Sequence, residues 1–394
     1  MHKVLEGIRV LDFGRYIAGP YCATLLGDMG AEVVRVERTR GSEDRYLMPV
    51  TEGGDGALYL QIGRNKLGMT LDPMKPEGRE IVHRLVATAD VVVANLPPKG
   101  LEAMGLDYDS LREVRPDIIL TTITALGTGG PDSDKLGFDG VAQANCGGMY
   151  LSGHPGDPMK ATVSYMDFGT ASLAAFATLS ALMARQQTGE GQHVEASLLA
   201  TGLSFAGPYL VEQGVTGVNR EPTGNRGQTA GPSDCFPTRD GWVLVQCVGD
   251  PLFRRWCRLM GEEHWIDDPR FASDQARGDN GGILSERMRS WCAERTTAQA
   301  LRELEQAGVP AGQVFTPQQA LDNPHIRAMH FFRELDYPGL PGPAPVPDTP
   351  VRFSGLEAGV RRRAPTLGEH TDELLGALGY DADAIAALRE RGVV

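Results

Sequence analysis

Asp167 is the residue whose type and position best suit covalent chemistry. It opens the apolar run 167–187, for which a helix is expected, so its carboxylate can face the free amide groups of a first helical turn. As a helix N-cap it would be structural, a role that aspartate favours. Held ionised by the same amides and the helix dipole, it could instead attack an activated carbonyl and form an anhydride, with the amides holding an oxyanion. The pattern leaves both interpretations open.

Positive charge gathers after the second predicted strand. Arg38 and Arg40 follow residues 31–37, at the carboxyl edge where open α/β sheets bind ligands. Three further cations come soon after: Arg64, Lys66 and Lys75. Solvated loops would carry such residues too, but in a chain with a net charge of −13 a cluster of cations stands out. The cluster indicates a polyanionic ligand, and Arg38 and Arg40 could contact its phosphate or ribose groups.

Other catalytic motifs are absent from the sequence. Residues 127–130 lack the third glycine of a dinucleotide-binding loop, and the sequence has neither a Gly-Lys-Ser/Thr phosphate loop nor a Gly-x-Ser-x-Gly serine motif. The six cysteines form no Cys-x-x-Cys pair, and the eight histidines include no His-Glu-x-x-His motif. We therefore expect no metal, and neither a nicotinamide dehydrogenase nor a P-loop enzyme.

The composition is that of a globular protein with two or three domains. The chain has 394 residues, of which 41% are hydrophobic and 23% charged. Its acidic balance argues against nucleic acid or an anionic membrane as the main partner. The N-terminus has no basic stretch before a long apolar run, and we expect no apolar segment of the roughly 18 residues that a membrane helix needs. A cytoplasmic location is therefore expected.

The elements that must position these residues alternate along the N-terminal half. Strands are expected at 7–13, 31–37, 90–93 and 118–123, and helices at 21–29 and 76–88. The run 118–123 hardly alternates between apolar and polar residues, which is typical of a strand covered on both faces. The order of elements predicts a parallel α/β sheet. The Ala- and Leu-rich run 167–187 predicts a helix buried in its core.

A second region is expected from about residue 224. A loop-like segment at 223–227 precedes a predicted strand at 242–247. Six prolines between Pro338 and Pro350 indicate an extended linker rather than packed structure. A polar tail with two short helices follows, and the three arginines at 361–363 are expected to be solvated within it.

Motifs spread along the chain resemble those of the class III CoA-transferase family (CaiB/BaiF type), which includes formyl-CoA, carnitine and succinyl-CoA-dependent CoA-transferases. They occur in the same order, from Leu5 to Thr371. The matching segments are 5–13, 18–20, 30–37, Asn65-Lys66, 89–95, Gly137-Phe138-Asp139, the Asp167 segment and 363–371. Each motif is weak alone, but their colinearity makes the resemblance specific.

The resemblance implies a fold and an assembly. It implies a large Rossmann-like parallel-sheet domain in residues 1–223 and a smaller α+β domain in residues 224–336. The segment 337–394 would be a linker followed by a return to the large domain. Two chains would interlock as a homodimer.

The resemblance also implies a reaction. CoA would pass from an acyl-CoA donor to a free carboxylic acid, with CoA thioesters as substrates and no tightly bound cofactor. Asp167 matches the family's nucleophile, which forms an aspartyl anhydride with the acyl group and then an aspartyl-CoA thioester.

The family's binding residues map onto named positions of this chain. Those implied to line the CoA site are Ala18, Arg38, Leu71, Asn95, Leu96 and Met104. Those implied to form the acyl pocket are Arg15, Ile17, Phe138 and Asp139. Formyl-CoA transferase has a glutamine at the position of Ile17, an arginine at that of Ala103 and a run of glycines in its lid, so formyl or oxalyl transfer is not expected here.

Two alternatives stay open. An α-methylacyl-CoA racemase of the same fold would use a histidine at the position of Phe138, which cannot exchange a proton; His154 could replace it only if its loop folded inward. A CoA-binding protein without turnover would not need Asp167. Arg15 and Arg226 could each bind a second substrate carboxylate or form a structural salt bridge.

Overall fold

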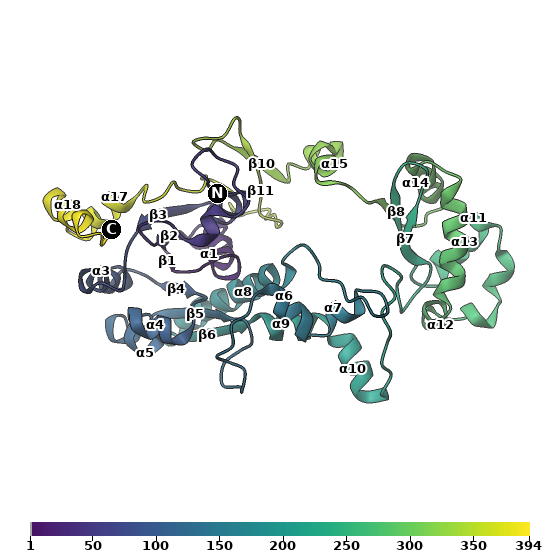
Figure 1. The fold of residues 1–394 in the computed structure, drawn as a ribbon, viewed down its shortest axis with the longest axis horizontal. Coiled ribbons are helices and arrows are strands. Elements are labelled where there is room, and N and C mark those ends of the chain that lie inside the picture. Colours follow the sequence, from purple (N-terminus) through teal and green to yellow (C-terminus); the bar gives the residue numbers. More distant parts are fainter. Residues whose placement is uncertain (1) are drawn as a thin grey trace. The chain divides into compact units, whose positions relative to one another are not determined.

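The computed structural model describes residues 2–394, which divide into two compact units (Figure 1). The first unit comprises residues 2–146, Ala161–Leu210 and Arg327–Val394. The second comprises Gly147–Lys160 and Val211–Ile326. The second unit therefore begins before the expected position 224, ends before 336 and includes a separate piece of the N-terminal half. The C-terminal segment belongs to the first unit.

The first unit is built on a six-stranded parallel sheet in the order β3-β2-β1-β4-β5-β6. The strands are β1 (Arg9–Asp12), β2 (Glu32–Glu37), β3 (Lys66–Thr70), β4 (Val91–Ala94), β5 (Ile119–Thr124) and β6 (His193–Ser197). This sheet confirms the predicted α/β fold. The strand order reverses between β1 and β4, and in open α/β sheets ligands bind at the carboxyl ends of strands beside such a switch point.

Helices cover both faces of this sheet. Neighbouring strand residues enter opposite cores: Val91 and Val93 lie in one apolar cluster and Val92 in the other. Burial on both faces explains why these strands have almost continuous apolar sequences. The helices of the first unit are α1 (Ala18–Asp28), α2 (Ala57–Ile62), α3 (Pro76–Ala87), α4 (Pro98–Met104), α5 (Tyr108–Val114), α6 (Asp139–Asn145), α8 (Tyr165–Thr188), α9 (Leu198–Phe205), α17 (Thr371–Ala377) and α18 (Ala382–Glu390), with a 3-10 turn, η1 (Glu43–Tyr46).

Helix α8 is buried on one face only. Ala171 and Ala174 pack into the core with α1 and the sheet, whereas Leu173, Phe176 and Met183 are 46%, 69% and 64% exposed. The expected core helix thus has a second apolar face that the single chain leaves uncovered. By length and composition α8 could also cross a bilayer, contrary to the expectation that no apolar segment is long enough; its packing on the sheet is that of a core helix, which passes the same test.

The proline-rich segment is more ordered than the sequence indicates. Strand β10 (Phe332–Leu335) pairs antiparallel with β11 (Ala344–Pro347), so part of the expected linker is a β-hairpin. The hairpin register places Pro345 and Pro347 opposite Glu334 and Phe332. Prolines are tolerated here because an edge strand of a two-stranded sheet needs few backbone donors.

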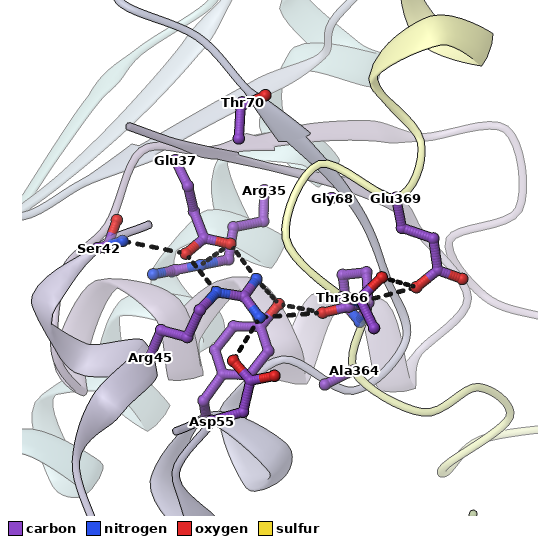
Figure 2. Close-up of polar contacts among 12 residues, drawn as sticks. Arg35, Glu37, Ser42, Arg45, Asp55, Gly68, Thr70, Ala364, Thr366 and Glu369 are labelled. Carbon is purple, nitrogen blue, oxygen red and sulfur yellow. Dashed lines mark hydrogen bonds and ion pairs between the residues drawn. The ribbon is translucent and has the colours of Figure 1, made fainter. Parts of the chain in front are cut away.

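The chain between 361 and 371 covers the outer edge of the parallel sheet, along β3; Figure 2 shows Thr366 and Glu369 of this segment beside Gly68. The amide of Asn65 donates to the carbonyl of Arg362, and the amide of His370 donates to the carbonyl of Gly68. A Cβ atom on Gly68 would come within 2.7 Å of the Pro365 ring, so only glycine allows this approach. The expected solvated tail therefore protects a sheet edge instead. Arg361 takes part by donating to the carbonyl of Gly27.

The second unit has its own core around an antiparallel sheet, β7 (Ser233–Pro237), β8 (Trp242–Gln246) and β9 (Ala311–Gln313). Trp256, Phe253 and Phe271 are fully buried against it. Its helices are α7 (Gly148–Leu151), α11 (Asp250–Met260), α12 (Asp274–Asp279), α13 (Gly281–Ala293), α14 (Thr297–Gln306) and α15 (Pro317–Asp322), with η2 (Glu263–Ile266) and η3 (Pro269–Phe271). Helices α10 (Gly207–Thr216) and α16 (Pro324–Ala328) each contain a boundary between the units.

Candidate active site

A cavity of about 430 Å³ opens at the carboxyl ends of the central strands, beside the switch point of the sheet. Each neighbouring strand contributes the residues that follow it, which is why segments far apart in the sequence meet there. The lining residues are Arg15, Tyr16 and Ala18 after β1; Arg38 and Glu43 after β2; Asn95–Lys99 after β4; Ile123–Ala125 in and after β5; Ser133–Phe138; Asp167; and Leu198.

Asp167 lines this cavity from the first turn of α8 and is half-buried. Among the described residues, no group donates a hydrogen bond to its carboxylate. Burial, followed by the charge of Asp139, raises the pKa of Asp167 to about 7. The structure therefore holds a carboxylate that is neither capped nor paired, next to an open cavity.

Asp139 performs the capping that the sequence analysis considered for Asp167. Its Oδ1 accepts the amides of Met166 at 2.8 Å and of Asp167 at 3.2 Å, and its Oδ2 accepts Gln143 Nε2 at 2.5 Å. The amide of Phe168 donates to the carbonyl of Ser164. The expectation that first-turn amides hold the Asp167 carboxylate ionised, or hold an oxyanion, is wrong because these amides already have acceptors.

Asn95 joins the loop after β4 to the loop after β1. Its side-chain Oδ1 accepts the amide of Arg15 at 2.6 Å, and its Nδ2 donates to the carbonyl of Arg15 at 2.8 Å. A Cβ atom on Gly19 would lie 2.9 Å from the Asn95 side chain, so the Ala18-Gly19-Pro20 motif leaves room for this clamp. The Asn95 side chain therefore has a structural role besides lining the cavity, because both its oxygen and its nitrogen bond the backbone of Arg15.

The aromatic wall of the cavity comes from Phe138 and Tyr16. Their rings meet edge to face with centroids 5.2 Å apart, and Phe138 is 60% exposed. Tyr16 has a φ of +57°, a left-handed conformation that is uncommon outside glycine. Such strain is typical of residues held in place at functional sites.

Besides Arg15, three cations line the cavity. Arg38 is exposed and pairs with Glu43 at 2.7 Å, and Lys135 pairs with Asp132 at 2.7 Å. Lys99, at the start of α4, has no carboxylate within ion-pair distance in the part of the chain that the structure describes. The sequence analysis did not identify Lys99 or Lys135. Lys99 could have been found by its position after β4, at the same sheet edge as Arg38.

The other cations of the predicted cluster serve the fold instead. Arg64 is buried and bonds Asp28, and Lys66 is buried and bonds Asp12 at 2.8 Å. Lys75 donates to carbonyl groups near the C-terminus. Their proximity in the sequence therefore did not indicate a common site, because each of the three side chains bonds a different part of the fold.

Several residues implied by the family resemblance do not line this cavity. Leu71 and Met104 lie in the apolar core on one face of the sheet. Ile17 is the residue before α1, and Asp139 is 4% exposed beneath the cavity wall. Arg226 belongs to the second unit, where its guanidinium donates to the carbonyl of Gly278.

Arg15 forms no salt bridge with any described residue. Its Nη1 donates to the backbone carbonyls of Phe13, Gly14 and Val36, at 2.8 to 3.4 Å. A structural ion pair, one of the two interpretations of this residue, is therefore not present.

None of the described residues that line the cavity is a histidine. His154 belongs to the second unit and packs against Gly224. Within residues 2–394 the structure brings together no group of three or more histidine, cysteine or acidic side chains able to hold a metal.

Comparison with known proteins identifies the class to which this fold and site belong. The model of CoA-transferase family III matches residues 5–371, and the chain belongs to this family. It is 34% identical to succinyl-CoA–D-citramalate CoA-transferase of Chloroflexus aurantiacus, over all of this chain and 98% of that protein. It is 33% identical to human succinyl-CoA:glutarate CoA-transferase, over all of this chain and 90% of that protein.

A solved structure agrees with the family assignment. The CaiB/BaiF family protein from Brucella suis superposes with a TM-score of 0.83 at 32% identity, covering 96% of this chain and 100% of that one. The protein is a CoA-transferase that acts on CoA thioesters. The resemblance inferred from the sequence motifs is thereby confirmed.

Proposed function

We propose that the enzyme moves CoA from an acyl-CoA donor to a free carboxylic acid through covalent intermediates on Asp167. The observation that carries the proposal is the unpaired Asp167 carboxylate in the cavity, with a pKa raised to about 7. A carboxylate without hydrogen-bond donors keeps its electron pairs available, and near neutral pH a large share of it is ionised.

In the first half of the cycle, an oxygen of Asp167 attacks the thioester carbonyl of the donor. A carbon–oxygen bond forms, the carbon–sulfur bond breaks, and CoA leaves as a thiolate, which gives an aspartyl anhydride. The thiolate then attacks the Asp167 carbonyl carbon of the anhydride. The donor acid leaves as a carboxylate, and CoA is attached to Asp167 as a thioester.

In the second half, the carboxylate of the acceptor attacks the Asp167 thioester, giving a new anhydride and the CoA thiolate. The thiolate attacks the acceptor carbonyl, which forms the new acyl-CoA and restores the Asp167 carboxylate. Each step exchanges one activated acyl bond for another, so the cycle needs no external energy source.

The lining of the cavity supports binding of CoA. Besides Arg15, it includes the cations Arg38, Lys99 and Lys135, in a chain whose net charge is −13. We assign these cations to the phosphate groups of CoA, because guanidinium and ammonium groups bind phosphate by charge-assisted hydrogen bonds. Phe138 and Tyr16 would then flank the thioester end. The names of the relatives favour succinyl-CoA as donor.

The direct test is trapping of the intermediate. The protein is mixed with succinyl-CoA and quenched, and intact and peptide masses are recorded. We expect CoA attached through Asp167, lost when an acceptor acid is added. Asp167→Ala should form no adduct and lose transfer, whereas Asp109→Ala, a change to an exposed carboxylate on α5, should retain both. Full transfer by Asp167→Ala would refute the mechanism; exchange of the α-proton with solvent but no adduct would favour a racemase.

The uncovered face of α8 supports the homodimer that the family resemblance implies. Leu173 and Phe176 on α8, with Phe205 on α9, are exposed apolar side chains of the first unit. An apolar surface of this kind marks an interaction site. We therefore propose that a second copy of this chain covers it. Light scattering should give twice the chain mass, and Phe176→Glu should shift the protein towards monomer; a monomeric wild-type protein would refute this assembly.

A further inference from the structure

We propose that Arg15 binds the distal carboxylate of a dicarboxylic substrate, and that this contact makes the enzyme selective for dicarboxylic acyl groups. The inference rests on the proposed function, since it assigns one end of the substrate to Asp167. The other end, four or five carbons along, would then reach Arg15, which lines the same cavity.

The first argument is the unused edge of the Arg15 guanidinium. Its three backbone contacts, to Phe13, Gly14 and Val36, all use Nη1. Its Nε is buried and has no hydrogen-bond partner, and Nη2 makes no hydrogen bond to a described residue. Nε and Nη2 together form the edge that binds a carboxylate through two parallel hydrogen bonds. A buried donor without a partner is costly, so a ligand that satisfies it gains affinity.

The second argument is that Asp12 and Asp44, two acids whose charges act on Arg15, already have ion-pair partners. Asp12 Oδ2 lies 2.8 Å from Lys66 Nζ and 3.3 Å from Arg35, and Asp44 Oδ2 lies 2.5 Å from Arg35. All four side chains are buried. Neither acid is within ion-pair distance of Arg15.

Glu37 is likewise committed (Figure 2). Its carboxylate accepts two hydrogen bonds from Arg45, of 3.1 and 2.5 Å, and lies 3.8 Å from Arg35 Nε. Arg45 in turn bonds Asp55. Each acid of this network thus has a direct ion-pair partner other than Arg15, and Arg15 itself forms no ion pair with a described residue.

Arg15 lacks a direct counter-ion in a cavity wall that also holds acids. Burial, followed by the nearby charge of Arg35, lowers the pKa of Arg15 from its ordinary value. The charges of Asp44, Asp12 and Glu37 act against this shift. A guanidinium nevertheless stays charged in proteins. The free carboxylate of a bound dicarboxylic acid would give this guanidinium the direct ion-pair partner that it lacks.

The cavity has a suitable size for such a substrate. Its volume of about 430 Å³ lies within the range of small-molecule sites. The loop that carries Arg15 is fixed at both backbone polar groups by Asn95, so the guanidinium is held on a rigid support. A rigid support is what allows a charged group to discriminate between ligands.

The first experiment uses the unchanged enzyme. With glutaryl-CoA as donor, acceptor kcat/KM is compared for succinate and succinamate, in which a neutral amide replaces one carboxylate. With succinyl-CoA as donor, glutarate and glutaramate are compared in the same way. If Arg15 binds the distal carboxylate, each amide should be poorer by at least about tenfold, as expected for loss of a hydrogen bond to a charged group. Equal values for acid and amide would overturn the proposal.

Substitutions locate the effect. Arg15→Met should reduce the succinate-to-succinamate ratio at least about tenfold, mainly through KM for succinate, while Arg15→Lys should retain part of it because the charge remains. Arg289→Met, a change to an exposed arginine of the second unit, is the matched control and should keep the wild-type ratio. An unchanged ratio in a folded Arg15→Met enzyme would exclude Arg15.

The two hypotheses can fail separately. If wild-type enzyme forms no CoA adduct on Asp167 with any donor, the proposed function fails. If the adduct forms and transfer proceeds but the acid-to-amide ratio does not depend on Arg15, only the inference about Arg15 fails. If Arg15→Met does not fold, the comparison of succinate with succinamate on the wild-type enzyme still tests whether the distal carboxylate is bound.

Discussion

The carboxylate of Asp139 accepts the backbone N–H of Asp167 at 3.2 Å, so one aspartate caps the helix on which the other stands. This contact has two consequences. It satisfies the amide that Asp167 could otherwise have used to stabilise its own charge. It also brings a second carboxyl group close, and burial together with Asp139 raises the pKa of Asp167 to about 7.

The rate at which Asp167 becomes acylated should therefore depend on pH. Only the ionised carboxylate is a nucleophile, so the rate of adduct formation with succinyl-CoA should increase through a midpoint near pH 7 and level off above pH 8. Quenched-flow mass spectrometry between pH 5.5 and 9 measures this. A rate already at its plateau at pH 5.5 would show that the Asp167 pKa is not raised.

Asp139→Asn tests the cause of that midpoint. The substitution removes the charge but keeps an oxygen that can accept the amide of Met166. The pKa of Asp167 should then fall, and the midpoint should move to lower pH. Asp132→Asn, which changes an exposed carboxylate, is the control and should leave the midpoint in place.

Asp167 should also make the protein less stable as pH increases. Because its pKa is higher in the folded chain than the ordinary 3.8, the folded state holds a proton that the unfolded state has lost between pH 4 and 7. The free energy of unfolding of the wild type, relative to Asp167→Asn, should fall across that range by up to about 4 kcal/mol and then stay constant. Urea titrations at pH 4.5, 6 and 8 measure it. A difference that does not change with pH would contradict the raised pKa.

The sheet could be predicted from the sequence because its physical signal is local. Runs such as Val91–Val93 are apolar at every position, and the structure buries their alternate side chains in two different cores. The candidate nucleophile Asp167 could be singled out from its place before an apolar helix. The lining of the cavity by Arg38 and Asn95 follows from their positions after strands.

What the sequence could not show depends on contacts between distant segments. The capping of α8 by Asp139 joins residues 28 positions apart, and no local pattern distinguishes it from capping by Asp167 itself. The burial of Lys66 depends on its partner Asp12, 54 positions away, so a residue that was predicted to bind a polyanion is part of the core. The tail at 361–371 could be located only once the free edge of β3 was known.

Arg38 should contribute to binding of CoA rather than to chemistry. It lines the cavity with its guanidinium exposed, so Arg38→Gln should raise KM for succinyl-CoA by roughly tenfold, in line with the loss of one charge-assisted hydrogen bond, and leave kcat nearly unchanged. A succinyl-pantetheine substrate, which lacks the phosphates, is the control and should not distinguish the variant from the wild type. An equal loss with both substrates would place Arg38 elsewhere in the mechanism.

The C-terminal segment should depend on Arg45, which reaches it from the buried network (Figure 2). Arg45 Nη1 donates to the carbonyl of Pro365 at 3.3 Å, while Nη2 bonds Glu37. Arg45→Met leaves buried acids without their cation, so the free energy of unfolding should fall by about 3–5 kcal/mol. In Arg45→Met, the backbone amide hydrogens of residues 361–371 should be the first to exchange faster with solvent. Arg363→Met, which breaks the partly exposed pair with Glu369 and a hydrogen bond to the carbonyl of Ala364, should cost less, because the ion pair is accessible to solvent. Equal losses in the two variants would show that the buried network does not hold this segment.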